Sequence, residues 1–243
     1  MDSFLCGYKD INDMIKKSLL VLLVIVGIIL IGYPYIADFV LKVISDTHAE
    51  DLHQLTESEL DENQKREANF NFNSVDEVTL TRTLVGSQKF DKKSIIGQLI
   101  ISDINLNLSI VKGVSEFNLL VGAATMKKDQ IMGKGNYSLG GHYIKRKDTL
   151  FGGLMDIKKG SIIQVTDKKM VYEYIVYDIQ VVKDTNTLMI DDEKAIERGK
   201  PIISLMTCYY SSKTGKRFFV LGELEKEYPY DDLFHQKVKN SIP

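Results

Sequence analysis

Residues 171–182 read VYEYIVYDIQVV, a run rich in the β-branched and aromatic residues that favour strands. Apolar and polar residues alternate only approximately along it, so both faces of the expected strand are fairly apolar. A strand with two apolar faces is typical of a closed barrel or a sandwich, because neither side is fully open to water. This stretch therefore predicts a mainly β fold, and we expect a single closed barrel, mixed but mainly antiparallel.

Further β-prone runs lie on both sides of this strand, separated by Gly, Asp, Asn and Lys. Two intervening segments, around residues 116–124 and 191–198, look helical or irregular. The sequence contains no repeat of about 20 to 50 residues, no βαβ alternation and no Gly-rich phosphate loop. The other expected strands lie in GQLIISDINLNLSIV (97–111), NYSLGGHYI (136–144), SIIQVTD (161–167), PIISLMTC (201–208) and RFFVLGEL (217–224).

A different pattern precedes the barrel: residues 18–36 read SLLVLLVIVGIILIGYPYI and contain no charged residue. That length is about one bilayer crossing, and the run has no polar face, which argues against a buried helix of a soluble protein. It is longer than the ~7 to 15 apolar residues of a typical signal peptide, and no clear small-x-small cleavage site follows. We therefore expect an uncleaved transmembrane signal anchor over residues 18–40, with a cleaved signal peptide as the alternative.

Lysines set the expected orientation of this anchor. Lys9, Lys16 and Lys17 precede the span, whereas only Lys42 closely follows it before an acidic stretch. Cytoplasmic flanks carry the excess of positive charge, so residues 1–17 are expected inside the cell. The chain beyond about residue 42 is then expected on the outer side of the cell membrane.

Beyond the span, residues 41–74 are polar, mostly acidic and rich in helix formers, which predicts a helical stalk. Leu52, Leu55 and Leu60 give this stalk a thin apolar stripe, which either touches the following domain or only spaces it from the membrane. Residues 75–243 are expected to form the barrel domain.

The charge balance excludes one class of partner. The chain has 31 Lys and Arg against 33 Asp and Glu, a formal net charge of −2. That balance creates no basic field of the kind that nucleic-acid binding needs. We therefore expect no nucleic-acid partner.

The two cysteines lie on opposite sides of the expected membrane span. Cys6 precedes it and Cys208 follows it, so the topology prevents a disulfide between them. A lone thiol outside the cytoplasm is prone to oxidation, which favours a chemical role for Cys208. The alternative is an inert cysteine that is simply buried.

A nucleophilic cysteine needs a proton-handling partner and a donor for the oxyanion. Cys208 ends the apolar run 202–207, so it lies at a strand end where the next loop can expose its sulfur. His142 follows two glycines that allow close backbone approach. Arg217 opens the next β-prone run, and a hairpin would return its guanidinium to Cys208. Each residue alone also has an ordinary structural explanation.

Taken together and in this order, the residues resemble the sortase family. Residues 204–208, SLMTC, resemble its Thr-Leu-x-Thr-Cys signature, and residues 140–142, GGH, match its histidine strand. Residues 150–154, LFGGL, resemble its Leu-Phe-x-x-Leu segment. One N-terminal span is the class A layout. The resemblance covers about residues 75–225 and implies a barrel of about eight strands in a cysteine transpeptidase.

The resemblance assigns roles to individual residues. The Cys208 thiolate would attack the Thr-Gly carbonyl of a Leu-Pro-x-Thr-Gly (LPxTG) sorting signal and form a thioester. His142 would protonate the leaving amine and Arg217 would steady the substrate and the oxyanion. Thr207, Ser204 and Gly141 would contribute to substrate binding, with Thr207 beside the nucleophile.

The implied partners are secreted proteins that carry the sorting signal, the amine of a lipid-linked peptidoglycan precursor, and the membrane. Two departures from the family pattern stand out: Ser204 replaces a usual Thr, and Lys216 directly precedes Arg217. We favour Arg217 as the functional cation because its planar fork holds a carbonyl oxygen better than an ammonium does.

Some relatives bind calcium through carboxylates near the strand before the histidine. Here residues 126–130 read MKKDQ, and lysines repel a cation that wants several oxygen ligands. We therefore expect no metal and no cofactor. Three alternatives remain at this point: a pilus-type sortase, a hydrolytic cysteine peptidase, and a non-catalytic β-domain displayed on a stalk. The pilus-type enzyme usually has an Asp-Pro-aromatic lid and a second span, and neither is present.

Overall fold

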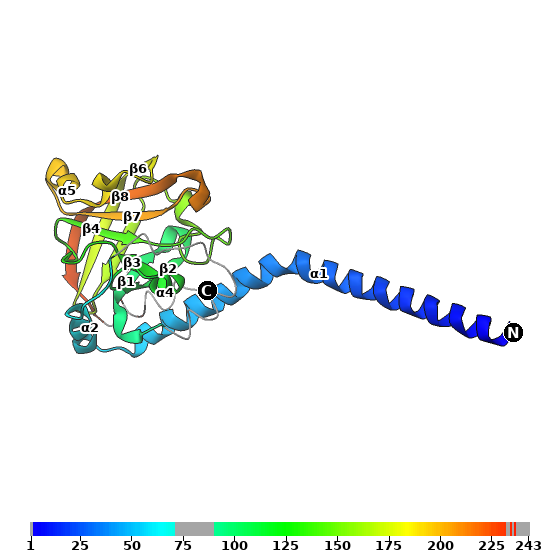
Figure 1. Ribbon diagram of the computed structural model, residues 1–243. Coiled ribbons are helices and arrows are strands. Elements are labelled where there is room, and N and C mark those ends of the chain that lie inside the picture. Colours follow the sequence, from blue (N-terminus) through cyan, green and yellow to red (C-terminus); the bar gives the residue numbers. More distant parts are fainter. Residues whose placement is uncertain (1, 71–89, 232–233, 235, 237–243) are drawn as a thin grey trace. The chain divides into compact units, whose positions relative to one another are not determined.

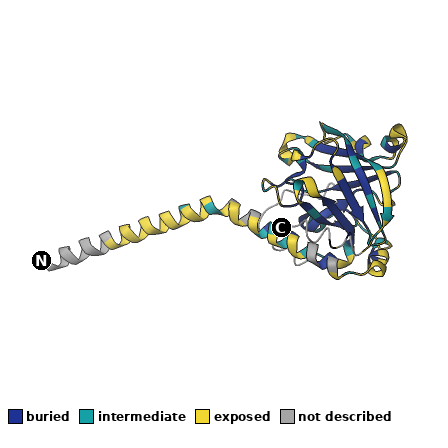
Figure 2. Cartoon of the chain, turned by 180° about the vertical axis from the view of Figure 1, so that it is seen from behind, coloured by how far each residue is buried: buried dark blue, intermediate teal, exposed yellow. Residues whose placement is uncertain are grey.

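A computed structural model describes residues 2–70, 90–231, 234 and 236. The chain divides into two compact units, Met1–Phe39 and Val40–Pro243. Helix α1, Asp2–Gln54, runs through the first unit and continues into the second (Figure 1). Among the described residues, one stretch, Met14–Tyr33, is long and apolar enough to cross a membrane, and its side chains are almost all exposed (Figure 2). It overlaps the anchor expected over residues 18–40.

The described part of the second unit contains eight strands in a closed barrel, in the order β1-β2-β3-β4-β7-β8-β6-β5 (Figure 1). The pairs β2–β3 and β4–β7 are parallel, and the other six neighbouring pairs are antiparallel. The predicted closed, mixed and mainly antiparallel barrel is confirmed. The strands are β1 Ile95–Ile101, β2 Leu106–Val111, β3 Gly122–Thr125, β4 Asn136–Gly140, β5 Ile162–Thr166, β6 Met170–Lys183, β7 Ile202–Cys208 and β8 Lys216–Pro229.

Short helices precede the barrel and connect its strands. Besides the end of α1, the α-helices in the described part of this unit are α2 Glu57–Gln64, α4 Glu116–Val121 and α5 Glu193–Arg198, and the sequence predicted the last two regions as helical or irregular. Single 3₁₀ turns are η2 Lys92–Ser94, η3 Ser102–Ile104, η4 Leu154–Asp156, η5 Thr187–Ile190 and η6 Ser212–Thr214.

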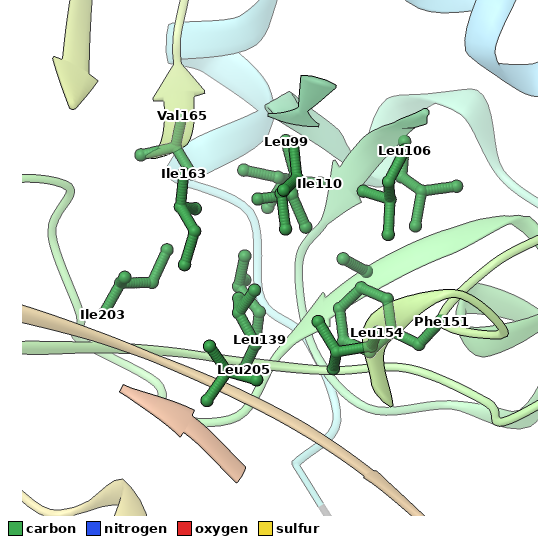
Figure 3. Close-up of a cluster of buried hydrophobic side chains, with 14 of the residues drawn as sticks. Leu99, Leu106, Ile110, Leu139, Phe151, Leu154, Ile163, Val165, Ile203 and Leu205 are labelled. Atoms are coloured by element: carbon green, nitrogen blue, oxygen red, sulfur yellow. The ribbon is translucent and has the colours of Figure 1, made fainter. Parts of the chain in front are cut away.

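The barrel interior is filled with aliphatic and aromatic side chains from all sides (Figure 3). Leu139 of β4 and Leu205 of β7 face it, and both are fully buried. Phe151 and Leu154, from the LFGGL segment, are also fully buried in this core, so the segment has a packing role. Each such side chain contributes roughly 1.5–3 kcal/mol through burial.

The polar segment after the apolar Met14–Tyr33 stretch packs on the barrel. Leu52 and Leu60 are each 1% exposed and lie in a cluster with residues of β1, β2, β3 and α4. Lys168, in the β5–β6 turn, donates from Nζ to the carbonyl oxygens of Leu52 (2.7 Å) and Leu55 (2.5 Å) near the end of α1. Of the two roles that the sequence left open for the leucine stripe, contact with the domain is the one observed.

Polar contacts also fix this segment. Asp51 is 7% exposed and accepts from Lys92 Nζ at 2.6 Å, with His48 Nδ1 2.8 Å from its other oxygen. Burial alone would raise the pKa of Asp51, but the hydrogen bonds and charges of Lys92 and His48 lower it below its usual value. Asn63 Nδ2 donates to Ile95 O at 2.8 Å. Residues 40–64 are thus an integral layer of the second unit.

Candidate active site

Three neighbouring strands carry the three residues that the sequence predicts to be catalytic. Cys208 ends β7 and pairs directly with Arg217 of β8 in the antiparallel ladder. β4 runs parallel to β7 with Gly140 opposite Met206, so His142 and Cys208 each lie two residues beyond that pair. The hairpin predicted to return Arg217 to Cys208 is confirmed.

Alternation along the strands places these residues on one face. Leu139, Leu205 and Phe218 belong to the barrel core. Successive side chains of a strand point to opposite faces. Cys208 lies three residues after Leu205, and Arg217 lies one residue before Phe218, so both side chains face outward. His142 follows the same alternation just beyond β4. The barrel therefore brings a thiol, an imidazole and a guanidinium to one region of its outer surface.

Backbone contacts hold the strand ends of His142 and Cys208 together. Gly141 N donates to Met206 O at 3.0 Å, and Thr207 Oγ1 donates to Gly141 O at 2.8 Å. Thr207 is 1% exposed. These two bonds fix the backbone next to both functional groups, so in this structure Thr207 and Gly141 position the site from inside the barrel.

Gly141 is required because the core leaves no room for a side chain there. A Cβ at this position would lie 2.7 Å from the fully buried Phe151 ring. We expect Gly141→Ala to shift Phe151 or the strand end, to cost about 1–3 kcal/mol of unfolding free energy, and to lower activity. Gly140→Ala is the matched control, since its Cβ would meet only the flexible side chains of Met126 and Met206, at 3.4 Å or more. Equal stability of the two variants, measured by urea unfolding, would refute this steric argument.

Ser204, predicted to bind substrate, is fully buried. Its hydroxyl lies 2.7 Å from Asn136 Oδ1 and 3.0 Å from Met189 O. Asn136 Nδ2 in turn donates to Met189 O and Asp191 O. With no exposed surface, Ser204 does not present its hydroxyl to a substrate in this structure; it holds the β6–β7 connection against β4 and β7. Sequence reasoning did not single out Asn136, because the partners of its side chain are 53 or more residues away in the chain.

A lysine lies where a cation-binding cluster would need carboxylates. Lys127 Nζ donates to Asp192 Oδ1 at 2.6 Å, and the same oxygen accepts from Asn136 N at 2.8 Å. Burial opposes ionisation of Asp192, but Lys127 and the Asn136 amide keep its pKa below the usual value. Within the described residues, no group of three or more His, Cys, Asp or Glu side chains is arranged to hold a metal ion.

His142 is neutral at pH 7. Burial lowers its pKa to about 4, because the imidazolium would lose its hydration. Its Nε2 atom is buried, and no hydrogen-bond partner for it exists among the described residues. A neutral imidazole keeps a lone pair on one ring nitrogen, through which it can accept a hydrogen bond or, at a cost set by burial, a proton.

This depressed pKa makes stability depend on pH. The unfolded chain binds a proton at His142 near pH 6.5, and the folded chain does so only near pH 4. The contribution of neutral His142 to the unfolding free energy is therefore fully present above pH 6.5 and declines towards pH 4. The loss is expected to reach up to about 3 kcal/mol. Urea unfolding of the wild type and of His142→Gln, measured from pH 7.5 to 4, isolates this loss. The contributions of the carboxylates are common to both proteins and cancel in the difference. A pH-independent difference between the two would contradict the assignment.

The strand register places Arg217, and not Lys216, directly opposite Cys208. Arg217 is the direct partner of Cys208, whereas Lys216 pairs with Lys183 on the other side of β8. Arg217 Nη1 donates to Lys216 O at 3.2 Å and lies 3.9 Å from Asp184 Oδ2. These contacts are loose, so the guanidinium can reorient towards a bound carbonyl oxygen.

Tyrosines that sequence reasoning did not single out flank the site. Tyr143 follows His142, and Tyr209 and Tyr210 follow Cys208. The rings of Tyr143 and Tyr210 meet edge to face at 5.9 Å, and those of Tyr209 and Tyr210 lie 4.6 Å apart. The available signal was their position next to the two candidate catalytic residues. The ring contacts link the loop after β4 to the loop after β7.

Comparisons with known proteins agree with this geometry. The sortase domain family model matches residues 99–225. Sortase A of Listeria monocytogenes is 37% identical over 213 residues, 88% of this chain and 93% of the relative, and sortase A of Bacillus anthracis is 33% identical over 88% and 96%.

Solved structures show the same fold. The Listeria monocytogenes sortase A crystal structure has a TM-score of 0.56 and 38% identity, covering 60% of this chain and 97% of that chain. Sortase C-3 of Streptococcus pneumoniae, at 18% identity, shares the fold with a TM-score of 0.59, and the match covers 82% of this chain and 99% of that chain. The chain therefore belongs to the sortase family and is a sortase transpeptidase.

Proposed function

We propose that this sortase cleaves LPxTG-type sorting signals between Thr and Gly and joins the Thr carboxyl to an amine of a cell-wall precursor. The observation that supports it most is the register of β4, β7 and β8, which carries His142, Cys208 and Arg217 to one outer face. A thiol, a neutral imidazole and a guanidinium are the groups that acyl transfer through a thioester requires.

The first half-reaction uses His142 as the group that carries the proton. Neutral His142 takes the proton of the Cys208 thiol as the sulfur bonds to the Thr carbonyl carbon. Arg217 stabilises the oxyanion of the tetrahedral intermediate. When the carbon–nitrogen bond breaks, the imidazolium gives its proton to the leaving Gly amine, and the Thr acyl group stays on Cys208 as a thioester.

In the second half-reaction an amine replaces the departed glycine. It attacks the thioester carbonyl and loses a proton to His142, and the Cys208 sulfur leaves and is reprotonated. We propose that the amine belongs to a lipid-linked peptidoglycan precursor. The Met14–Tyr33 stretch would anchor the enzyme with residues 1–17 in the cytoplasm and the barrel outside. Enzyme, secreted substrate and lipid-linked acceptor would then share one surface, which raises their effective concentration.

The test uses the full chain in detergent with a quenched fluorescent LPxTG peptide, with and without an oligoglycine amine. Mass spectrometry identifies the products. Cleavage between Thr and Gly, with the amine joined to the new Thr end, supports the proposal. Cleavage that yields only the free acid at saturating amine would establish a hydrolytic peptidase instead, and preference for a lysine side-chain amine would indicate the pilus-type alternative.

A further inference from the structure

A pocket of about 200 Å³ lies between α2, β1, the β3–β4 connection and the β5–β6 turn. Leu60, Ile96, Met132 and Tyr137 line it, and all four side chains are buried. Tyr137 is the second residue of β4, whereas His142 follows the other end of that strand. The pocket is therefore separate from the candidate active site and needs its own explanation.

The pocket contains a polar group whose hydrogen bonding is poorly satisfied. Tyr137 is 1% exposed, and its hydroxyl forms no hydrogen bond of normal geometry with the described residues, although the Gln130 side chain is close enough to lower its pKa against the larger effect of burial. Burial raises the pKa of Tyr137, so the group remains a neutral hydroxyl at any physiological pH. Leaving a buried hydroxyl unpaired is costly. A ligand that donates a hydrogen bond at this point would remove the cost.

The polar lining is acidic. Glu57, Asp61 and Asp167 line the pocket together with a single cation, Lys169. Lys169 Nζ lies 3.5 Å from Glu57 and 3.7 Å from Asp61, and Asp61 also pairs with Lys65. No lysine, arginine or histidine among the described residues pairs with the Asp167 carboxylate.

The Asp167 carboxylate instead accepts backbone hydrogen bonds within the β5–β6 turn. Its Oδ1 accepts from the backbone N–H groups of Lys169 and Met170 at 2.9 Å each. Its charge, like that of Glu227, helps to raise the pKa of Tyr172, after the larger effect of burial. The pocket therefore combines an apolar floor, a poorly satisfied hydroxyl and one uncompensated carboxylate.

We propose that this pocket binds a small organic cation with an apolar body, an arylalkylammonium being the simplest form. The ammonium group would lie against the Asp167 carboxylate and donate to the Tyr137 hydroxyl, and the apolar body would contact Leu60, Ile96 and Met132. One aromatic ring with a short substituent suits the volume, since a cavity of about 150 Å³ accommodates benzene. The proposal does not depend on the chemistry at Cys208.

Three ligands of nearly equal size test the charge preference: benzylammonium, benzyl alcohol and benzoate. The full chain, methyl-labelled and in phosphatidylcholine nanodiscs, is titrated with each while the methyl resonances of Met132, Ile96 and Leu60 are followed by NMR. We expect benzylammonium to shift all three resonances and to bind at least about tenfold more tightly than benzyl alcohol, and benzoate not to bind. Absence of these shifts, or similar affinity for all three ligands, would overturn the proposal.

Substitutions test the two polar contacts. Asp167→Asn keeps an oxygen for the turn but removes the charge, and we expect it to weaken benzylammonium binding about tenfold while leaving benzyl alcohol unaffected. Tyr137→Phe should weaken benzylammonium binding about fivefold. Asp103→Asn, an exposed change away from the pocket, is the matched control. If Asp167→Asn binds benzylammonium as the wild type does, in a chain with unchanged methyl spectra, the site does not recognise a cation.

Discussion

Cys208→Ala is expected to abolish transpeptidation, lowering turnover by at least about 10³-fold, while the barrel remains folded. In the proposed mechanism the Cys208 thiol forms the acyl-enzyme, and loss of this nucleophile removes the covalent route. Cys208 is half-buried at the strand end, so replacing its sulfur with a hydrogen leaves the barrel core unchanged. Initial rates with the sorting-signal peptide, beside a thermal unfolding curve, measure the two effects separately.

Cys6→Ala is the matched control, since it removes the other cysteine of the chain. We expect it to retain full activity. Turnover that survives in Cys208→Ala would mean that another residue is the nucleophile. Loss of activity together with loss of the unfolding transition would show that the cysteine is needed for folding, which contradicts the expectation that the barrel remains folded.

A soluble chain that begins at residue 75 is expected to be much less stable than one that begins at residue 40. The shorter chain lacks Leu41, Leu52 and Leu60, which are 1–2% exposed, and it opens the face of the barrel that they cover. Burial of three leucines contributes roughly 5 kcal/mol or more, a large part of the total stability of a typical domain. Urea unfolding of the two chains measures the difference.

Single substitutions separate packing from chain length. Leu52→Ala is expected to cost about 2–5 kcal/mol because it leaves a cavity in the cluster on the barrel. Leu188→Ala, at a position that is 61% exposed, should change stability by no more than about 0.5 kcal/mol. If the chain from residue 75 unfolds at the same urea concentration as the chain from residue 40, residues 40–64 are a spacer after all.

The parts of the fold that sequence predicts best are those with local signals. The two apolar faces of β6 indicated a closed barrel, and the short distance in sequence between Cys208 and Arg217 indicated a hairpin. The adjacency of β4 and β7 is different. Their parallel pairing joins residues 66 positions apart, and no local pattern encodes it, so His142 was placed beside Cys208 only through the family resemblance.

Burial is the property on which the sequence is least informative. The leucine stripe of residues 41–74 was too thin to show that the segment packs on the barrel, because its partners lie in β1, β2, β3 and α4. Ser204 belongs to a motif that suggests contact with substrate, yet its hydroxyl is committed to Asn136 and Met189. Which hydroxyls are buried depends on tertiary contacts, and a strand sequence does not report them.

The most direct measurement is the intact mass of the full chain after brief mixing with an LPxTG peptide in the absence of amine, followed by peptide mapping. We expect the enzyme to gain the mass of the peptide up to Thr, on Cys208, as a thioester. Adding an amine should remove this adduct and release the joined product. Cleaved peptide without any adduct, or an adduct on another residue, would contradict the proposed mechanism.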